Sequence, residues 1–190
     1  MAHHPASKIP FPGIFLALLA MTVFRSGAAC AESESEALEY QKKAAFISSF
    51  TRFVEWPARK FPQPDAPFVI GVFGLDTISD HLQEAVQNRQ IKGHPVVVKR
   101  VDNVGDLHTC HVLFIGRSER DRLPPIFAEL RRESVLTIGE CDNFLTRGGM
   151  INFVITNGAT HFQINTAATE RERLAISSKL LQIALPIEDE

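Results

Sequence analysis

The spacing of apolar residues changes along the chain between a helical and an extended pattern. From Glu36 to about Val54, apolar side chains recur at intervals of three and four, with Phe46, Phe50 and Phe53 on one stripe. This spacing predicts an amphipathic helix. The polar residues of the same segment, Gln41, Lys42, Lys43 and Arg52, fall mainly off that stripe. The stripe is either a core face or a face that binds a ligand or partner.

The middle of the chain alternates between short apolar runs and segments with helix signals. Phe68–Phe73 is a continuous apolar run, as expected for a strand that is covered on both faces. Similar runs predict three further strands, at Val96–Val101, His111–Ile115 and Val135–Ile138. Helices are predicted between the strands, one from Asp76 or Thr77 to about Asn88 and one over Glu119–Arg132.

The last third predicts a β-hairpin followed by a helix. Met150–Thr156 and Thr160–Asn165 alternate apolar and polar residues around Asn157-Gly158, the pair that best tolerates the positive φ angles of a type I′ turn. Asn165 or Thr166 is expected to cap a final helix of about 18 residues. Together these elements predict a single-domain α/β sandwich, with a mixed, mostly parallel sheet of about six strands, helices on both faces and a terminal hairpin.

Charge is distributed unevenly, and this separates the N-terminus from the rest. The chain has 190 residues and a formal charge of −2, but none of its 22 acidic residues precedes Glu32. Lys8 precedes the apolar run Ile14–Phe24, which is too short to span a bilayer and suits a secretory signal. We expect residues 1–31 to be that signal, cleaved after Ala29-Cys30-Ala31. A lipoprotein signal acylated at Cys30 is the alternative.

Residues 32–190 are then one domain, with 18 basic and 22 acidic residues. Without a basic block, nucleic acid is not an expected partner. Gly71–Gly74 follows a strand but lacks the spacing of a dinucleotide-binding loop, so we expect no nucleotide cofactor. His108, Cys110 and His111 do not form a metal-ligand set, because adjacent strand residues point to opposite faces. We therefore expect no metal, no cofactor and no catalytic activity.

Two cysteines, Cys110 and Cys141, remain after cleavage of the signal. Cys110 opens one predicted strand and Cys141 follows the end of the next. The ends of parallel neighbours of this length are roughly 15 Å apart at ~3.3 Å per residue. A disulfide needs Cα atoms within about 7 Å, so we predict no bridge between these two cysteines within one chain.

Three further positions are candidates for binding. Trp56 lies between the Phe-rich helix and a proline-rich loop, and is either a core plug or a partner anchor. His161 lies in a hairpin strand beside Phe162, where it either packs as an ordinary strand residue or contacts a ligand or partner. Asn165, at the end of the same strand, is a candidate contact for the same ligand or partner.

Several segments in order resemble those of the YfiR family, and the resemblance covers nearly all of Ala44–Ala184. The segments are KKAAFISSFTRFVEWP (Lys42–Pro57), FVIGVFG (Phe68–Gly74), CHVLFIGRSE (Cys110–Glu119), VLTIGE (Val135–Glu140), FLTRGGMINF (Phe144–Phe153), HFQINTAA (His161–Ala168) and LAISSKLLQIA (Leu174–Ala184).

The resemblance implies a regulatory role rather than catalysis. YfiR-like proteins are periplasmic repressors that act on the periplasmic domain of an inner-membrane diguanylate cyclase of the YfiN type. An outer-membrane-associated YfiB-type lipoprotein sequesters the repressor and so releases cyclic-di-GMP synthesis, which favours biofilm formation. Members form dimers, and binding of a small molecule has been proposed for them. His161 matches a strand position implicated in ligand contact in a relative.

Two functions follow for this chain. The first is repression of a membrane cyclase by protein–protein contact. The second is a periplasmic module that senses a small ligand, with a pocket at the carboxyl ends of the strands near Gly74, Asp76, Gly116 and Glu140.

Overall fold

A computed structural model describes Met1 and residues 26–74 and 77–187. For residues 26–33 it describes the backbone alone, and side chains are described from Glu34 onward. The chain divides into two units, residues 1–36 and 37–190. The expected apolar signal segment, Ile14–Phe24, lies outside the described residues, and so does Asp76. Among the residues that the structure describes, no helix is long and apolar enough to cross a membrane.

The second unit is built on one mixed sheet of seven strands. The strands are β2 (Phe68–Phe73), β3 (Gln90–Ile91), β4 (His94–Val101), β5 (Val112–Ile115), β6 (Leu136–Gly139), β7 (Ile151–Thr156) and β8 (Ala159–Ile164). Their order across the sheet is β3-β4-β2-β5-β6-β7-β8. The five inner strands are parallel, whereas β3 and β8 run antiparallel at the two edges.

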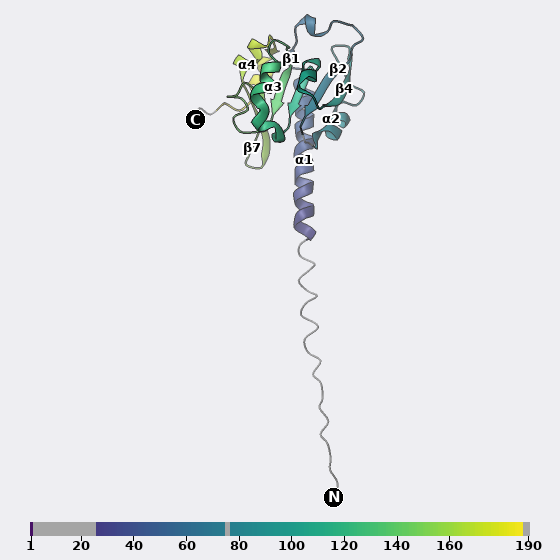
Figure 1. Ribbon diagram of the computed structural model, residues 1–190, viewed down its shortest axis with the longest axis vertical. Helices are drawn as coiled ribbons and strands as arrows, with labels where there is room; N and C mark the ends of the chain where they lie inside the picture. Colours follow the sequence, from purple (N-terminus) through teal and green to yellow (C-terminus); the bar gives the residue numbers. More distant parts are fainter. Residues whose placement is uncertain (2–25, 75–76, 188–190) are drawn as a thin grey trace. The chain divides into compact units, whose positions relative to one another are not determined.

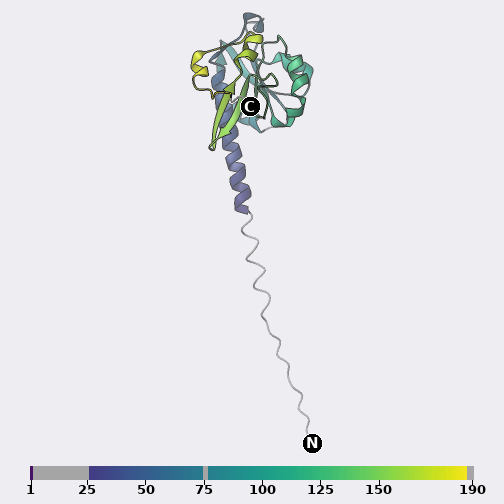
Figure 2. The ribbon, with the colours of Figure 1, turned by 90° about the vertical axis from the view of Figure 1, so that its left-hand side faces the viewer.

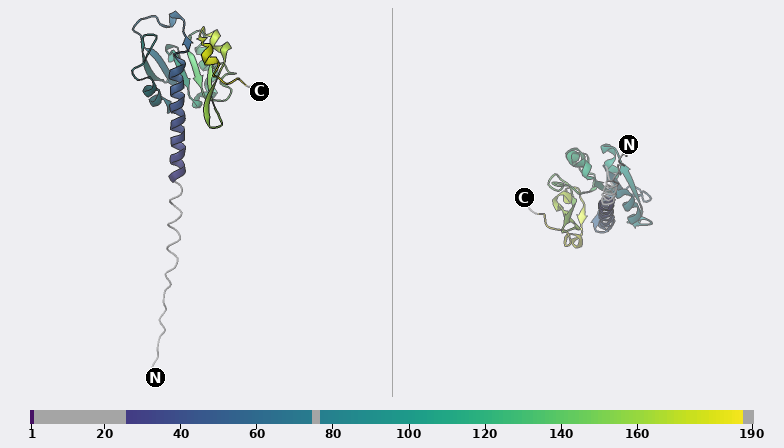
Figure 3. Two further views of the ribbon diagram at one scale, coloured as in Figure 1. Left: turned by 180° about the vertical axis from the view of Figure 1, so that it is seen from behind. Right: turned by 90° about the horizontal axis from the view of Figure 1, so that it is seen from below.

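Helices cover both faces of this sheet (Figure 1). The part of α1 (Ser26–Phe50) from Ala37 onward and α2 (Ile78–Val86) pack on one face. The other face carries α3 (Leu123–Glu129) and the 3₁₀ turn η2 (Val104–Thr109). A second 3₁₀ turn, η3 (Arg117–Arg122), leads into α3. Figure 2 shows α3 and α1 on opposite sides of the strands, and Figure 3 shows the β7–β8 hairpin beside α1.

Alternate residues of the inner strands face two separate cores. In β2, Phe68, Ile70 and Val72 belong to the core under α1 and α2. In β5, Leu113 and Ile115 belong to the core under α3. This explains why the strands are apolar without interruption, and the predicted α/β sandwich with two-faced burial is confirmed.

Three of the predicted helices differ from the structure. The predicted helix Glu119–Arg132 is divided into the 3₁₀ turn η3 and helix α3, which begins at Leu123 and ends at Glu129. Helix α1 ends at Phe50, not near Val54, because Val54–Glu55 forms a short strand, β1, antiparallel to β9 (Ala175–Ile176). The predicted final helix of about 18 residues is wrong for the same reason. It is replaced by α4 (Thr166–Arg171), β9 and α5 (Ser178–Leu181). Arg173 has a φ of 59°, which ends the first helix, and the Ser177 N–H donates to the Phe53 carbonyl at 2.8 Å.

The hairpin has the predicted turn, with φ of 52° at Asn157 and 74° at Gly158. Its outer strand, β8, is partly covered by the C-terminal segment. The Leu185 N–H donates to the Phe162 carbonyl at 2.9 Å, and the Gln163 side-chain amide donates to the Pro186 carbonyl at 2.9 Å. Asn165 caps α4, as expected, by accepting a hydrogen bond from the Ala168 N–H.

Candidate functional site

A buried ion pair joins helix α1 to the carboxyl end of β6. The Lys43 ammonium donates to the carboxylates of Glu140 and Glu39, and the Tyr40 hydroxyl donates to the second oxygen of Glu140 at 3.2 Å. Lys43 is 1% exposed and Glu140 is 6% exposed. Charged groups that are buried away from water need such partners, so this group of side chains fixes α1 to the carboxyl end of β6.

The sequence prediction placed Lys43 off the buried stripe, and this is wrong. Lys43 precedes Ile47 by four residues and Phe50 by seven, so it lies on the same helical face as these buried side chains. The spacing alone could have identified it. Lys43 was expected to be exposed because its side chain is charged. Its partner, Glu140, is distant in the chain, so the local sequence does not indicate that the charge is compensated.

Glu140 also lines a charged pocket of about 470 Å³. It lies at the carboxyl ends of the strands, the edge at which the ligand-sensing hypothesis places its site. An Arg117 side-chain N–H lies 3.5 Å from the Glu140 carbonyl, and Arg120 pairs with Asp121 at 3.7 Å. Its lining contains three arginines and three acidic residues. The lining residues are Arg117, Arg120, Asp121, Glu140, Cys141, Asp142, Asn143 and Arg147.

The predicted aromatic stripe is divided between core and surface. Phe50 is 1% exposed, and its ring lies 4.7 Å from Phe162 and 6.1 Å from Phe153, between ring centroids. Phe46 is half-buried and contacts the same rings, at 5.6 Å from Phe162. Phe53 is also half-buried. Only Phe46 and Phe53 of this stripe therefore have a surface that a partner could contact directly.

Trp56 is packed into the core. Its indole N–H donates to the His111 carbonyl at 3.1 Å, and its ring meets Phe68 edge-on at 5.1 Å between centroids. The residue is 6% exposed. A buried indole with a satisfied N–H stabilises the junction between α1 and the sheet, whereas its role as a partner anchor stays a prediction.

His161 lies in β8, and Asn165 directly follows the end of that strand. His161 is half-buried. The Asn165 amide donates to the Leu145 carbonyl at 3.0 Å as well as capping α4. Between them lies Gln163, and opposite Gln163 in β7 is Asn152, whose buried side-chain oxygen has no hydrogen-bond partner among the described residues. The binding role of His161 and Asn165 stays a prediction.

His111 is held as a neutral ring by its surroundings. It stacks against both Phe61 and Phe68, at 4.9 and 4.6 Å between ring centroids, and its Nδ1 accepts a hydrogen bond from the Val69 N–H at 3.1 Å. Burial, together with the nearby charge of Lys60, lowers the pKa of His111 to about 4. Burial also lowers the pKa of Lys60 to about 8. This imidazole is a packing element.

The two described cysteines are free and buried. Burial raises the pKa of both thiols, which disfavours the reactive thiolate. Within residues 26–74 and 77–187, no group of three His, Cys, Asp or Glu side chains is arranged to hold a metal ion.

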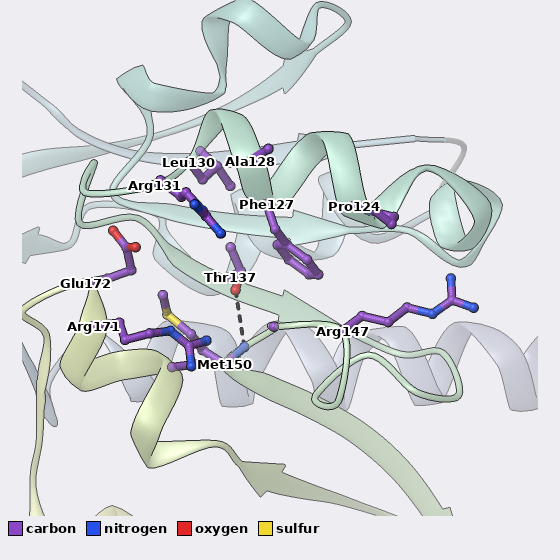
Figure 4. Close-up of a pocket in the computed structure, with 12 residues that line it drawn as sticks. Pro124, Phe127, Ala128, Leu130, Arg131, Thr137, Arg147, Met150, Arg171 and Glu172 are labelled. Carbon is purple, nitrogen blue, oxygen red and sulfur yellow. Dashed lines mark hydrogen bonds between the residues drawn. The ribbon is translucent and has the colours of Figure 1, made fainter.

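A groove between α3 and α4 lies toward the amino ends of the parallel strands (Figure 4). It measures about 280 Å³, and Thr137 on its floor accepts a hydrogen bond from the Met150 N–H at 3.2 Å. In Figure 4, Arg131, Arg171 and Glu172 lie at one end and Arg147 at the other, with Phe127 between them. The groove thus has an apolar centre and charged ends, and its lining residues, which are spread from Pro124 to Glu172, form no local motif in the sequence.

Comparisons with known proteins identify the family. A family model described as YfiR/HmsC-like matches residues 40–185. No curated protein matches the chain. Among solved structures, a conserved domain protein from Vibrio cholerae O1 biovar El Tor is similar, with 11% identity and a TM-score of 0.47 over 61% of this chain. The match spans 53% of that protein's chain, about half its length.

The family match includes the buried Lys43–Glu140 pair, all seven strands of the main sheet and the hairpin that carries His161. At the family level it supports regulation of cyclic-di-GMP signalling from the periplasm, by a domain that is regulatory and not catalytic. The chain belongs to the YfiR/HmsC-like family.

Proposed function

We propose that the protein represses an inner-membrane diguanylate cyclase of the YfiN type by binding the periplasmic sensor domain of that enzyme. The observation that carries the proposal is the family match over residues 40–185. A repressor of this kind acts by stabilising the inactive state of its receptor. It can shift the equilibrium between the active and inactive states only as far as its affinities for these two states differ. The protein itself would have no catalytic activity.

The proposal includes how the protein reaches its receptor. Residues 1–31 would direct export and be removed, so that the mature chain begins at Glu32 in the periplasm. The protein would act as a dimer, and a YfiB-type outer-membrane lipoprotein would sequester it. Release of the cyclase would then raise cyclic-di-GMP and favour biofilm formation.

Half-buried side chains near the β8 edge are our candidates for the receptor contact. Phe46 packs on Phe162 at 5.6 Å between ring centroids, on the face of the sheet that α1 covers. His161 precedes Phe162 in β8 and points to the opposite face, so the two candidates lie on either side of the β8 edge. A partly exposed aromatic ring beside a hairpin supplies a surface of the kind that forms interface hot spots. Val97, which is 40% exposed on β4 near the opposite edge of the sheet, serves as a matched control.

The test measures cyclic-di-GMP in the native host. Deletion of the gene is expected to raise cyclic-di-GMP several-fold, provided that the cyclase gene is present, and the wild-type gene should restore the low level. An unchanged level after deletion would reject the proposed function.

Complementation with variants then tests the surface. The double variant Phe46→Ala with His161→Ala is expected to leave cyclic-di-GMP high, whereas Val97→Ala should restore the low level. Thermal denaturation of the purified variants checks that each is folded at the growth temperature. Full repression by a folded double variant would remove this surface from the proposal and leave the repressor function standing.

A further inference from the structure

Four arginines from three separate segments line one small pocket. Arg59 lies in the 3₁₀ turn η1 (Ala58–Lys60), Arg132 follows α3, Arg171 ends α4, and Arg173 lies in the turn before β9. The pocket measures about 260 Å³, and no acidic side chain is among its lining residues. Ser134, two residues before β6, accepts a hydrogen bond from Arg59, which places the pocket toward the amino ends of the parallel strands. It is thus near the opposite end of β6 from the Glu140 pocket.

Hydrogen bonds hold the segments together around the pocket. One guanidinium nitrogen of Arg59 donates to the Arg132 carbonyl at 3.1 Å and to the Ser134 hydroxyl oxygen at 2.8 Å. The Ser134 hydroxyl in turn donates to the Glu172 carbonyl at 2.8 Å. A guanidinium has five N–H donors, so Arg59 keeps donors for a ligand while its position is fixed.

The backbone around the pocket is unusual. Arg132, Ser134 and Arg173 have φ angles of 67°, 54° and 59°. This left-handed conformation costs roughly 1–2 kcal/mol for residues other than glycine and asparagine, and such conformations cluster at functional sites. Apart from these three, Lys92 is the only described residue other than glycine or asparagine with a positive φ.

The positive charges of the pocket lack salt-bridge partners. All four arginines are exposed, and none forms an ion pair within the described part of the chain. Three carboxylates lie close by in the sequence, those of Glu133, Glu170 and Glu172. The Glu172 carboxylate accepts a hydrogen bond from the Ser134 N–H at 3.4 Å. The negative charge of Glu133 stabilises the Lys60 ammonium and so partly offsets the lowering of its pKa by burial.

We propose that this arginine pocket binds a phosphate-bearing anion through a phosphomonoester group. Such a group carries about −1.5 to −2 charges near pH 7 and three acceptor oxygens, which matches several converging guanidinium groups better than a single carboxylate does. Planar guanidinium groups bind phosphate oxygens in pairs. The phosphate comes either from a soluble phosphorylated metabolite or from a lipid headgroup.

The test variant replaces Arg132 and Arg173 together by asparagine. Asparagine tolerates a positive φ, so Arg132→Asn with Arg173→Asn removes two charges without adding backbone strain. The matched control is Arg100→Gln with Lys42→Gln. Both side chains are exposed and neither lines the pocket, and their replacement changes the net charge equally.

Isothermal titration calorimetry of the purified protein with inorganic phosphate and with glycerol 3-phosphate, at constant ionic strength, measures the soluble source. Sedimentation with vesicles of phosphatidic acid in phosphatidylcholine, against phosphatidylcholine alone, measures the lipid source. We expect saturable binding in at least one arm, weakened by about tenfold or more in the asparagine variant and by less than about twofold in the control.

The arm that binds identifies the source of the phosphate. Absence of saturable binding in both arms would overturn the proposal, and so would an equal loss in the control variant, which would indicate nonspecific attraction by net charge. Thermal denaturation of the asparagine variant distinguishes loss of the site from loss of the fold, because this variant is expected to be at least as stable as the wild type.

Discussion

Lys43 and Glu140 depend on each other for charge compensation in the interior. Replacing Lys43 by methionine leaves the Glu140 carboxylate, whose side chain is 3% exposed, without its cation. We predict that Lys43→Met lowers the free energy of unfolding by about 3–5 kcal/mol, as measured by urea denaturation.

Two variants make this result specific. Lys42→Met removes the same charge from an exposed neighbour and should change the stability by less than about 0.5 kcal/mol. Adding Glu140→Gln to Lys43→Met removes the unpaired carboxylate and should recover much of the loss. A double variant as unstable as the sum of both single variants would show that the two side chains are not coupled.

His111 gives the stability a pH dependence. Burial first, and Lys60 second, lower its pKa in the folded state from 6.5 to about 4. Between these values the unfolded chain binds a proton that the folded chain does not. The contribution of this group is therefore fully present above about pH 6.5 and is lost as the pH falls, by up to about 3 kcal/mol near pH 4.

Urea denaturation between pH 7 and pH 4 measures this dependence. In His111→Gln the decline toward acid should be shallower than in the wild type, because the variant lacks the group that titrates. His108→Gln, at an exposed histidine, should keep the wild-type slope. Equal slopes in the wild type and His111→Gln would contradict the assignment.

For single residues, the sequence identified which ones are candidates better than it predicted the burial and contacts of their side chains. Trp56 and His161 were recognised as candidates, yet whether each ring is buried depends on residues that are distant in the chain. Arg59, Arg132, Arg171 and Arg173 were not singled out, because arginines spread over more than 100 residues form no local motif. A fold is needed to bring them together.

Among the elements, the segment between β6 and β7 is the most tightly constrained by glycine. The Phe144 ring lies over Gly139 and Gly149, and a Cβ atom at these glycines would lie 2.4 Å and 2.2 Å from ring carbons. We predict that Gly149→Ala lowers the free energy of unfolding by about 1–3 kcal/mol or more, because the ring cannot move without disturbing the core under α3. Chemical denaturation measures the change.

Gly105→Ala is the matched control. A Cβ atom there meets nothing within 4 Å, so its effect should be within about 0.5 kcal/mol. A Phe144→Leu background tests the cause, since a smaller side chain should reduce the additional loss from Gly149→Ala. The same loss in both backgrounds would indicate that backbone conformation, not the ring, limits this glycine.

Elements with strong local signals were predicted correctly, and elements fixed by distant pairing were not. The apolar runs located β2 and β5, and Asn157-Gly158 located the hairpin turn. The prediction of one continuous final helix after Asn165 was wrong, because the two-residue pairing of β9 with β1 interrupts it. A strand of two residues has no periodicity from which it could be recognised.

For the whole molecule, the two cores should unfold together. Cys110 is 0% exposed and lies with Cys141, 8% exposed, in the core under α3, while most of the aromatic side chains belong to the core under α1. We predict that both thiols react with a thiol reagent only when the sheet unfolds. The urea dependence of labelling should coincide with that of circular dichroism.

The experiment uses a chain that begins at Glu32, so that only these two cysteines are present. Cys141→Ser isolates the more deeply buried Cys110. Labelling at lower urea than the circular dichroism transition would show that the α3 side opens separately. A thiol-free mass for the unreduced, alkylated monomer would instead show a disulfide within the chain.

The C-terminal segment beside β8 has a consequence for the behaviour of the protein in concentrated solution. An uncovered edge strand presents backbone N–H and C=O groups to a second chain, and this is a common start of aggregation. Leu185 and Pro186 occupy part of that edge. A chain truncated after Ala184 is therefore expected to form large assemblies by light scattering, whereas one truncated after Ile187 should not. A few residues outside the main core would then determine the colloidal stability of the molecule.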